Sequence, residues 1–153
     1  LLTKPISDFD IVLGKFLSTL TLATITLLPT IVYVISLKFL GPIDIGPIIS
    51  AYIGLILMSG IYIGVGIFAS SLTENQVVAF IISFLIIFIL FMLNKILIFL
   101  PAPLVSTLEY ISSDFHFGSI SRGVIDTKDI IYYFSGIIIL LLLTKTSLES
   151  RKW

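Results

Sequence analysis

Four long, apolar and almost uncharged stretches follow one another along the chain and are separated by short polar segments. The stretches at 16–37, 48–69 and 77–97 each suffice for a helix that crosses a hydrocarbon core of about 30 Å, at a rise of about 1.5 Å per residue. The fourth stretch, 130–146, reaches this length if Lys145 extends its ammonium group to the membrane surface. The pattern predicts four transmembrane helices.

The composition excludes a typical soluble domain. Hydrophobic residues make up 58% of the 153 residues and charged residues only 12%, whereas soluble domains carry about 25% charged residues. A formal net charge of 0 gives no electrostatic attraction for nucleic acid, and the lack of cysteine excludes disulfide scaffolds and thiolate metal sites. We therefore predict an all-α, polytopic helical membrane protein, with one transmembrane domain over 1–153 that lies in the lipid bilayer.

The segment 98–129 between the third and fourth stretches has a structure of its own. Pro101 and Pro103 end the third helix, and apolar residues then recur at helical spacing, namely Leu104, Val105, Leu108 and Ile111. This spacing predicts a short amphipathic helix in an outer loop. It either lies in the membrane interface or packs as a lid on the ends of the transmembrane helices.

Polar residues at the helix starts help to place the boundaries. Thr73 with Gln76 has the pattern of a capping box before the third stretch, and Asp126 with Asp129 places two carboxylates at the start of the fourth. With four crossings, both chain ends lie on one side of the membrane. That side carries five basic residues against four on the other, which favours cytoplasmic termini.

Small residues and a proline mark candidate contact and bending points. Gly54, Gly60 and Gly64 lie at spacings that let the second transmembrane helix pack closely against neighbours. Pro29 interrupts the first transmembrane helix, where nearby threonine side chains can bond the freed backbone carbonyls. It is either a hinge or a static kink.

The sequence offers little catalytic chemistry. Apart from Lys95 and Lys145 near helix ends, the four stretches lack the ionisable residues of a proton- or sodium-coupled carrier. His116 is the only histidine and lies in the outer loop, where Asp114 alone cannot complete a metal site, so we expect it to have no chemical role. Gly14-Lys15 lacks the remaining residues of a phosphate-binding loop. We expect no catalytic residue, no metal and no cofactor, and any ATP must bind to another chain.

Several segments together resemble the permease subunits of ABC-2 type transporters. LTKPISDFDIVLGKF at 2–16 is similar to the cytoplasmic stretch before the third of six transmembrane helices in that family, and FASSLTENQVVAF at 68–80 to its second cytoplasmic turn. SISRGVIDTKD at 119–129 and LESRKW at 148–153 resemble the gliding-motility-associated permease subunit of Bacteroidetes. The resemblance covers essentially the whole chain.

The resemblance implies a function without catalysis in this chain. The chain, which begins at Leu1 without methionine, corresponds to the last four of six transmembrane helices and is expected to be N-terminally truncated. Its residues 1–14 form a short cytoplasmic coupling helix against a separate ABC ATPase subunit. A second permease subunit, identical or related, is the other partner, in a multi-pass arrangement in the inner membrane. The implied ATPase contacts are Pro5, Ile6, Asp8, Phe9, Asp10, Glu74 and Asn75.

Two other functions remain open from the residues. A stand-alone channel or carrier requires polar pore-lining faces, and the four stretches show only scattered serine and threonine. A structural membrane anchor of a motility machine does not require polar pore-lining faces. A gene for an ATP-binding-cassette ATPase next to that of the permease is expected only for the exporter subunit, and the transported substrate cannot be read from these residues.

Overall fold

The computed structural model describes residues 6–151, and these residues form helices and short connections without any strand. The long helices arise because apolar residues fill each stretch and polar residues cap its start. In chain order the elements are α1 (Asp8–Leu27), the 3₁₀ turn η1 (Leu28–Thr30), α2 (Ile31–Leu40), α3 (Ile45–Leu72), α4 (Gln76–Ile96), the 3₁₀ turn η2 (Leu97–Phe99), α5 (Ala102–Ile111), α6 (Ser113–Ser121) and α7 (Thr127–Ser150).

Within the described residues, four helical segments are long and apolar enough to cross a membrane. They are Asp8–Leu40, which joins α1, η1 and α2, then Ile45–Leu72, Gln76–Phe99 and Thr127–Ser150. The predicted all-α, polytopic fold is thus confirmed, and the chain is a multi-pass membrane protein. Each segment extends beyond the predicted stretch, because the residues that flank the stretch also adopt the helical backbone.

The first helix begins earlier than its apolar stretch. Ser7 and Asp10 form a capping box, in which each side chain bonds the backbone N–H of the other residue. From Asp8 the helix continues without a break, so residues 8–14 are the first turns of α1 and not a separate short helix. Gly14 alone does not interrupt it, because a single glycine costs a helix only about 1 kcal/mol. Residues 1–5 lie outside the described part.

One of the predicted helix caps is confirmed and another is wrong. Asp126 caps α7, and its carboxylate accepts the Lys128 N–H at 3.4 Å, as expected from its position. The prediction that Thr73 caps the third transmembrane helix is wrong. Asn75 takes that place and accepts the N–H of Val77, while Thr73 ends α3. Two candidate caps two residues apart compete, and the tight turn selects the later one.

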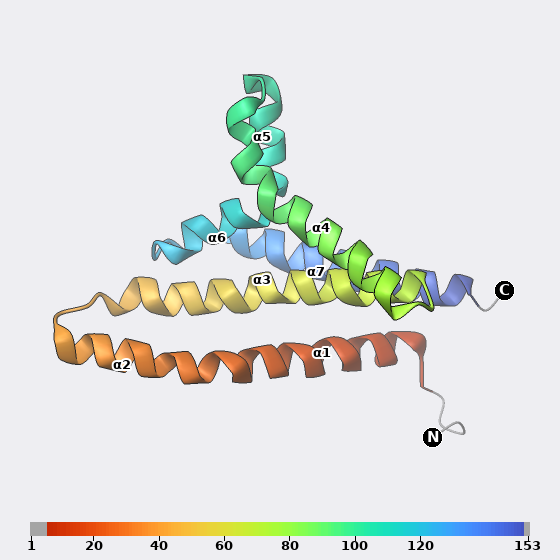
Figure 1. The fold of residues 1–153 in the computed structure, drawn as a ribbon, viewed down its shortest axis with the longest axis horizontal. Helices are drawn as coiled ribbons and strands as arrows, with labels where there is room; N and C mark the ends of the chain where they lie inside the picture. Colours follow the sequence, from red (N-terminus) through yellow and green to blue (C-terminus); the bar gives the residue numbers. More distant parts are fainter. Residues whose placement is uncertain (1–5, 152–153) are drawn as a thin grey trace.

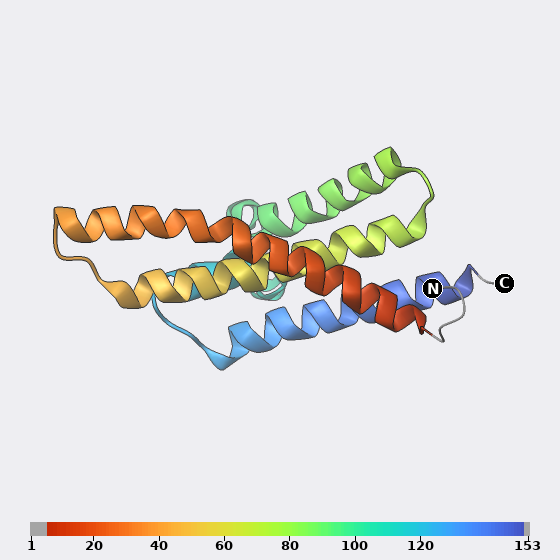
Figure 2. The same ribbon diagram turned by 90° about the horizontal axis from the view of Figure 1, so that it is seen from below.

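The helices form a bundle around α3. The α1–α2 rod runs antiparallel to α3, and α7 lies alongside both α3 and α1 (Figures 1 and 2). The beginning of α1, the α3–α4 turn and the end of α7 lie at one end of the bundle, called here the terminal end, as Figure 2 shows. The α2–α3 connection lies at the opposite end.

The buried core is small and lies along α3. Ile61 and Val65 of α3 pack with Ile120 of α6 and Tyr133 of α7. A second cluster near the terminal end joins Val12 and Phe16 of α1 to Leu141 of α7. Most other apolar side chains face outwards, as expected for helices that lipid surrounds.

The segment between α4 and α7 contains two helices. The predicted amphipathic helix is present as α5, which projects from the bundle and makes its main contacts with α4, η2 and α6 (Figure 1). It does not cover the ends of the other membrane-spanning helices as a lid. The following helix, α6, packs back onto α3, α4 and α7, and the turn after it uses Gly123 in the left-handed region, at a φ of 92°.

Candidate functional site

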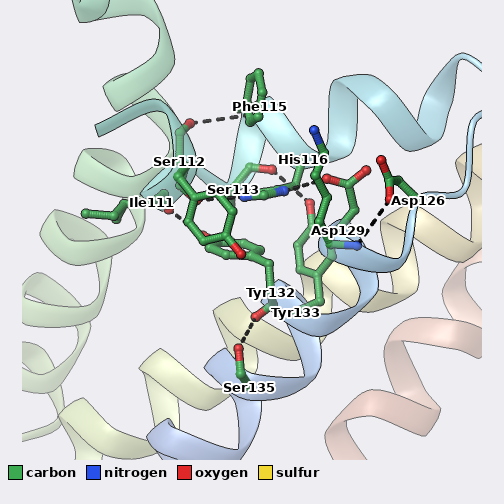
Figure 3. A network of polar contacts seen from close by, with 12 residues as sticks. Ile111, Ser112, Ser113, Phe115, His116, Asp126, Asp129, Tyr132, Tyr133 and Ser135 are labelled. Carbon is green, nitrogen blue, oxygen red and sulfur yellow. Dashed lines mark hydrogen bonds and ion pairs between the residues drawn. The ribbon is translucent and has the colours of Figure 1, made fainter. Parts of the chain in front are cut away.

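A buried histidine–aspartate pair joins α6 to the first turn of α7 (Figure 3). His116 Nδ1 lies 2.5 Å from Asp129 Oδ1, and both side chains have no exposed surface. The second carboxylate oxygen of Asp129, Oδ2, is buried without a hydrogen-bond partner among the described residues. Asp129 therefore depends on His116 for its compensation, because a buried carboxylate without a partner is strongly destabilising.

Both ring nitrogens of His116 face oxygen atoms. Nε2 lies 2.6 Å from the backbone carbonyl of Tyr110, an acceptor, so this nitrogen must carry a proton and donate it. Both ring nitrogens are thus engaged within the chain, and the pair joins α6 to α7.

Aromatic rings enclose the imidazole. The Tyr132 ring stacks on His116 with centroids 4.0 Å apart and planes inclined by 18°, and Tyr110 and Phe115 meet it edge to face. The Tyr133 hydroxyl donates to the carbonyl of Ser113 at 2.8 Å. These contacts exclude water from the pair and connect the start of α7 to the junction of α5 and α6.

Polar residues at the end of α4 extend the connection. Asn94 Nδ2 donates to Asp114 Oδ2 at 3.3 Å, and Lys95 Nζ lies 3.4 Å from the same oxygen. The Lys95 ammonium also lies 4.7 Å from the centre of the Phe91 ring. Lys95 and Asn94, which are unusual for the end of a transmembrane helix, thus hold α6 against α4.

Sequence reasoning missed this cluster. The sequence predicts no chemical role for His116 and a place at the helix start for Asp129; the structure adds that the two residues are partners across the α6–α7 turn. Asp114, which is close to His116 in sequence, contacts Asn94 and Lys95 instead, and the partner of His116 is the more distant Asp129. The available signal was the presence of the single histidine thirteen residues before an acidic residue that opens an apolar helix.

The predicted coupling residues lie at the terminal end. Pro5 lies outside the described residues. Ile6 is exposed, Asp8 and Phe9 are half-buried, and Asp10 is exposed, with its carboxylate accepting the Ser7 hydroxyl at 2.7 Å. The Asp8 side chain is not free, because it takes part in an interaction.

The remaining two predicted coupling residues form the α3–α4 turn. Glu74 and Asn75 are exposed at the same end of the bundle as the beginning of α1 (Figure 2). Asn75 is occupied as the cap of α4, whereas the Glu74 side chain is available on the surface. The structure thus places six of the seven predicted residues at one end, in two separate segments.

The three predicted packing glycines are buried in α3. A Cβ atom on Gly60 would lie 2.6 Å from Ile137 Cδ1, and one on Gly64 would lie 3.1 Å from Leu140 Cδ1, both on α7. At Gly54 the near neighbours are Ile120 and Phe117 of α6. These glycines let α6 and α7 approach the backbone of α3.

Pro29 lies in the 3₁₀ turn between α1 and α2. The turn changes the hydrogen-bond pattern over three residues while the rod continues to Leu40. Thr30 Oγ1 donates to the Leu27 carbonyl and lies 2.5 Å from the Tyr52 hydroxyl of α3. These bonds hold the interruption against α3, and the hinge role of Pro29 stays a prediction.

Residues 6–151 contain no cluster of three or more His, Cys, Asp or Glu side chains that could hold a metal ion. Comparison of the chain with protein-family models, with curated proteins and with solved structures finds no match. The function therefore has to be argued from the residues and their placement.

Proposed function

We propose that this chain is a membrane-spanning permease subunit of an ATP-driven exporter of the ABC-2 type, associated with gliding motility or secretion in the inner membrane. In this function a separate cytoplasmic ATPase subunit hydrolyses ATP, and a second permease subunit completes the transport path. The chain itself contributes no catalytic residue. It converts movement of the ATPase into movement of its helices.

The observation that carries the proposal is the placement of the two segments that resemble cytoplasmic parts of the family. The beginning of α1 and the α3–α4 turn are far apart in sequence but lie at the same end of the bundle (Figure 2). Ile6 and Glu74, one from each segment, are exposed there. A cytoplasmic partner that docks on this end contacts both segments at once.

The helix arrangement provides a physical route for coupling. Because α1 begins at Asp8 and continues as a rigid helix, a force on its first turn acts on the whole helix. Val12 and Phe16 of α1 are buried against α7, and α1 also packs on α3. Coupling requires that the ATPase contacts this surface differently in its two nucleotide states. A displaced first turn would then shift α3 and α7 together.

Site-directed cross-linking tests the proposal. The native sequence has no cysteine, so one cysteine introduced by Asp8→Cys in the full-length protein gives a unique reactive position. In native membranes we expect it to cross-link to an ATP-binding-cassette ATPase, with a yield that changes when ATP is added. Lys38→Cys, at the opposite end of the bundle, is the matched control and should give no such product.

Labelling with a membrane-impermeant thiol reagent completes the test. The proposal expects Lys38→Cys, and not Asp8→Cys, to react from outside the cell. External labelling of Asp8→Cys without an ATPase cross-link would invert the topology and exclude the exporter subunit. Cytoplasmic labelling without any ATPase product would instead favour a channel, a carrier or a structural anchor.

A further inference from the structure

An open groove lies at the terminal end between α1 and α3, with α7 as its floor. It has a volume of about 310 Å³. Lys15 and Ser70 line it together with apolar side chains, among them Ile63 and Ile67. The groove therefore combines one cation with a largely apolar lining.

The polar groups of the groove differ in whether they are already bonded. The hydroxyls of Thr19, Ser71 and Thr144 donate to backbone carbonyls of their own helices. The Lys15 ammonium and the Ser70 hydroxyl make no hydrogen bond or ion pair with any residue in the part of the chain that the structure describes. The same groove thus holds a cation and a hydroxyl donor without partners among these residues, and such a donor set suits a phosphate oxygen.

The depth of Lys15 suits the surface of the bilayer. It lies seven residues after the start of α1, or about 10 Å along the helix axis. Side chains of an α-helix lean towards its N-terminus, so the ammonium is directed back to the membrane surface. Ser70 lies two residues before α3 ends, at the same end of the bundle. The Ser70 hydroxyl and the Lys15 ammonium are therefore directed towards the headgroup layer, whereas Ile63, nine residues before the end of α3, lies about 13 Å along the helix from that end.

Gly66 opens the apolar part of the groove. A Cβ atom built on Gly66 meets nothing within 4 Å, whereas one on Gly60, in the same helix, would collide with Ile137. The space beside Gly66 is therefore not used for packing between the helices of the chain. It is continuous with the lining formed by Ile63 and Ile67.

We propose that this groove binds an anionic phospholipid, whose phosphate contacts Lys15 and Ser70 and whose acyl chain lies along Ile63, Gly66 and Ile67. A carboxylate of a partner protein would satisfy the ammonium but would leave the apolar interior empty. A lipid fills both parts. The proposal requires only that the chain spans a membrane and is independent of its role as an exporter subunit.

Binding of defined lipids to the full-length protein in detergent tests the proposal. Native mass spectrometry would compare dioleoyl-phosphatidylglycerol with dioleoyl-phosphatidylcholine. We expect phosphatidylglycerol to bind about fivefold more tightly, because a single basic side chain near anionic lipid contributes on that scale. Lys15→Gln should abolish the preference, and Gly66→Leu, which fills the groove, should weaken binding of both lipids.

Two control variants separate this site from general effects. Gly14→Leu adds the same side chain at another open glycine that does not line the groove, and Lys38→Gln removes a cation at the opposite end. Both should bind like the native protein, and the melting temperature of each lipid-free variant reports its folding. Equal affinity for the two lipids, or a preference that survives Lys15→Gln, would overturn the proposal. Saturable binding of inorganic phosphate without measurable binding of either lipid would identify an anion site without a lipid and would overturn it as well.

Discussion

Where α6 meets the start of α7, polar and charged side chains are buried and bonded to one another, whereas at the terminal end they are exposed. His116 and Asp129 have no accessible surface, and the hydroxyl of Tyr133 donates to a backbone carbonyl. At the terminal end Asp10 and Glu74 are exposed instead. The two regions thus use the same kinds of side chain in opposite ways.

The difference indicates that the junction of α6 and α7 holds the fold together, whereas the terminal end is available for contacts. A polar group in a low-dielectric interior is tolerated only with a partner, so a fully enclosed network fixes the positions of the helices that supply it. The network holds the segment between α4 and α7 onto the bundle. The exposed groups at the terminal end incur no such cost and remain available to a partner or to lipid.

Breaking the buried pair should give the largest effect on stability. Asp129→Ala leaves His116 with an unsatisfied nitrogen in a closed site, and we expect a loss of about 3–5 kcal/mol in the free energy of unfolding. Asp126→Ala, three residues earlier, removes only a helix cap and should cost about 1 kcal/mol. Thermal unfolding of the purified protein in detergent measures both. Equal losses would show that the buried pair has no special role.

A double substitution sharpens the same point. His116→Leu combined with Asp129→Leu removes both polar side chains together, and only the Tyr110 carbonyl, which His116 Nε2 contacts, loses a donor. The double variant should be more stable than Asp129→Ala, since replacing a complete buried pair by apolar groups is often close to neutral.

The fold was more predictable than this network. The four apolar stretches determined the number, order and approximate bounds of the membrane-spanning helices, because lipid leaves a chain no alternative to helices there. Pro101 and the apolar spacing after it located α5. The bounds differed where polar residues such as Asp8 continue a helix beyond its apolar part, which hydrophobicity alone does not record.

The candidate site depended on contacts that no local pattern encodes. His116 meets Asp129 only because α6 folds back across α3 and the turn at Gly123 brings the start of α7 beneath it. The local sequence indicates only that His116 lies in a loop and that Asp129 lies at a helix start. The groove beside Gly66 was equally hidden, because its walls come from three separate helices.

Glycine substitutions in α3 test the packing between the two ends. Gly60→Ala places a Cβ 2.6 Å from Ile137 Cδ1, so α7 must move, and we expect a loss of about 1–3 kcal/mol. Gly66→Ala meets nothing within 4 Å and should be neutral or stabilising by up to about 1 kcal/mol, since alanine favours the helix. Thermal unfolding compares the pair. A destabilised Gly66→Ala would show that its side of α3 is packed after all.

Removal of single hydroxyls gives a smaller effect. Tyr133→Phe deletes the bond to the Ser113 carbonyl inside the network, and we expect a loss of about 0.5–1.5 kcal/mol. Tyr33→Phe, on the exposed surface of α2, should change the free energy of unfolding by less than about 0.5 kcal/mol. Similar losses in the two variants would contradict the contrast between enclosed and exposed polar groups.

The smallest effect on stability is expected at the terminal end, where it separates stability from function. Glu74→Ala removes an exposed side chain and should change the free energy of unfolding by no more than about 0.5 kcal/mol. If this end receives the ATPase, the same variant should lower the yield of the ATP-dependent cross-link from Asp8→Cys, because the second docking segment has lost a charged contact.

Glu109→Ala on α5 is the control and should leave the yield unchanged, since α5 does not lie at the terminal end. An unchanged yield in both variants would restrict the docking surface to the beginning of α1. A lower yield with reduced stability would instead show that the exposed end, too, serves the architecture of the bundle.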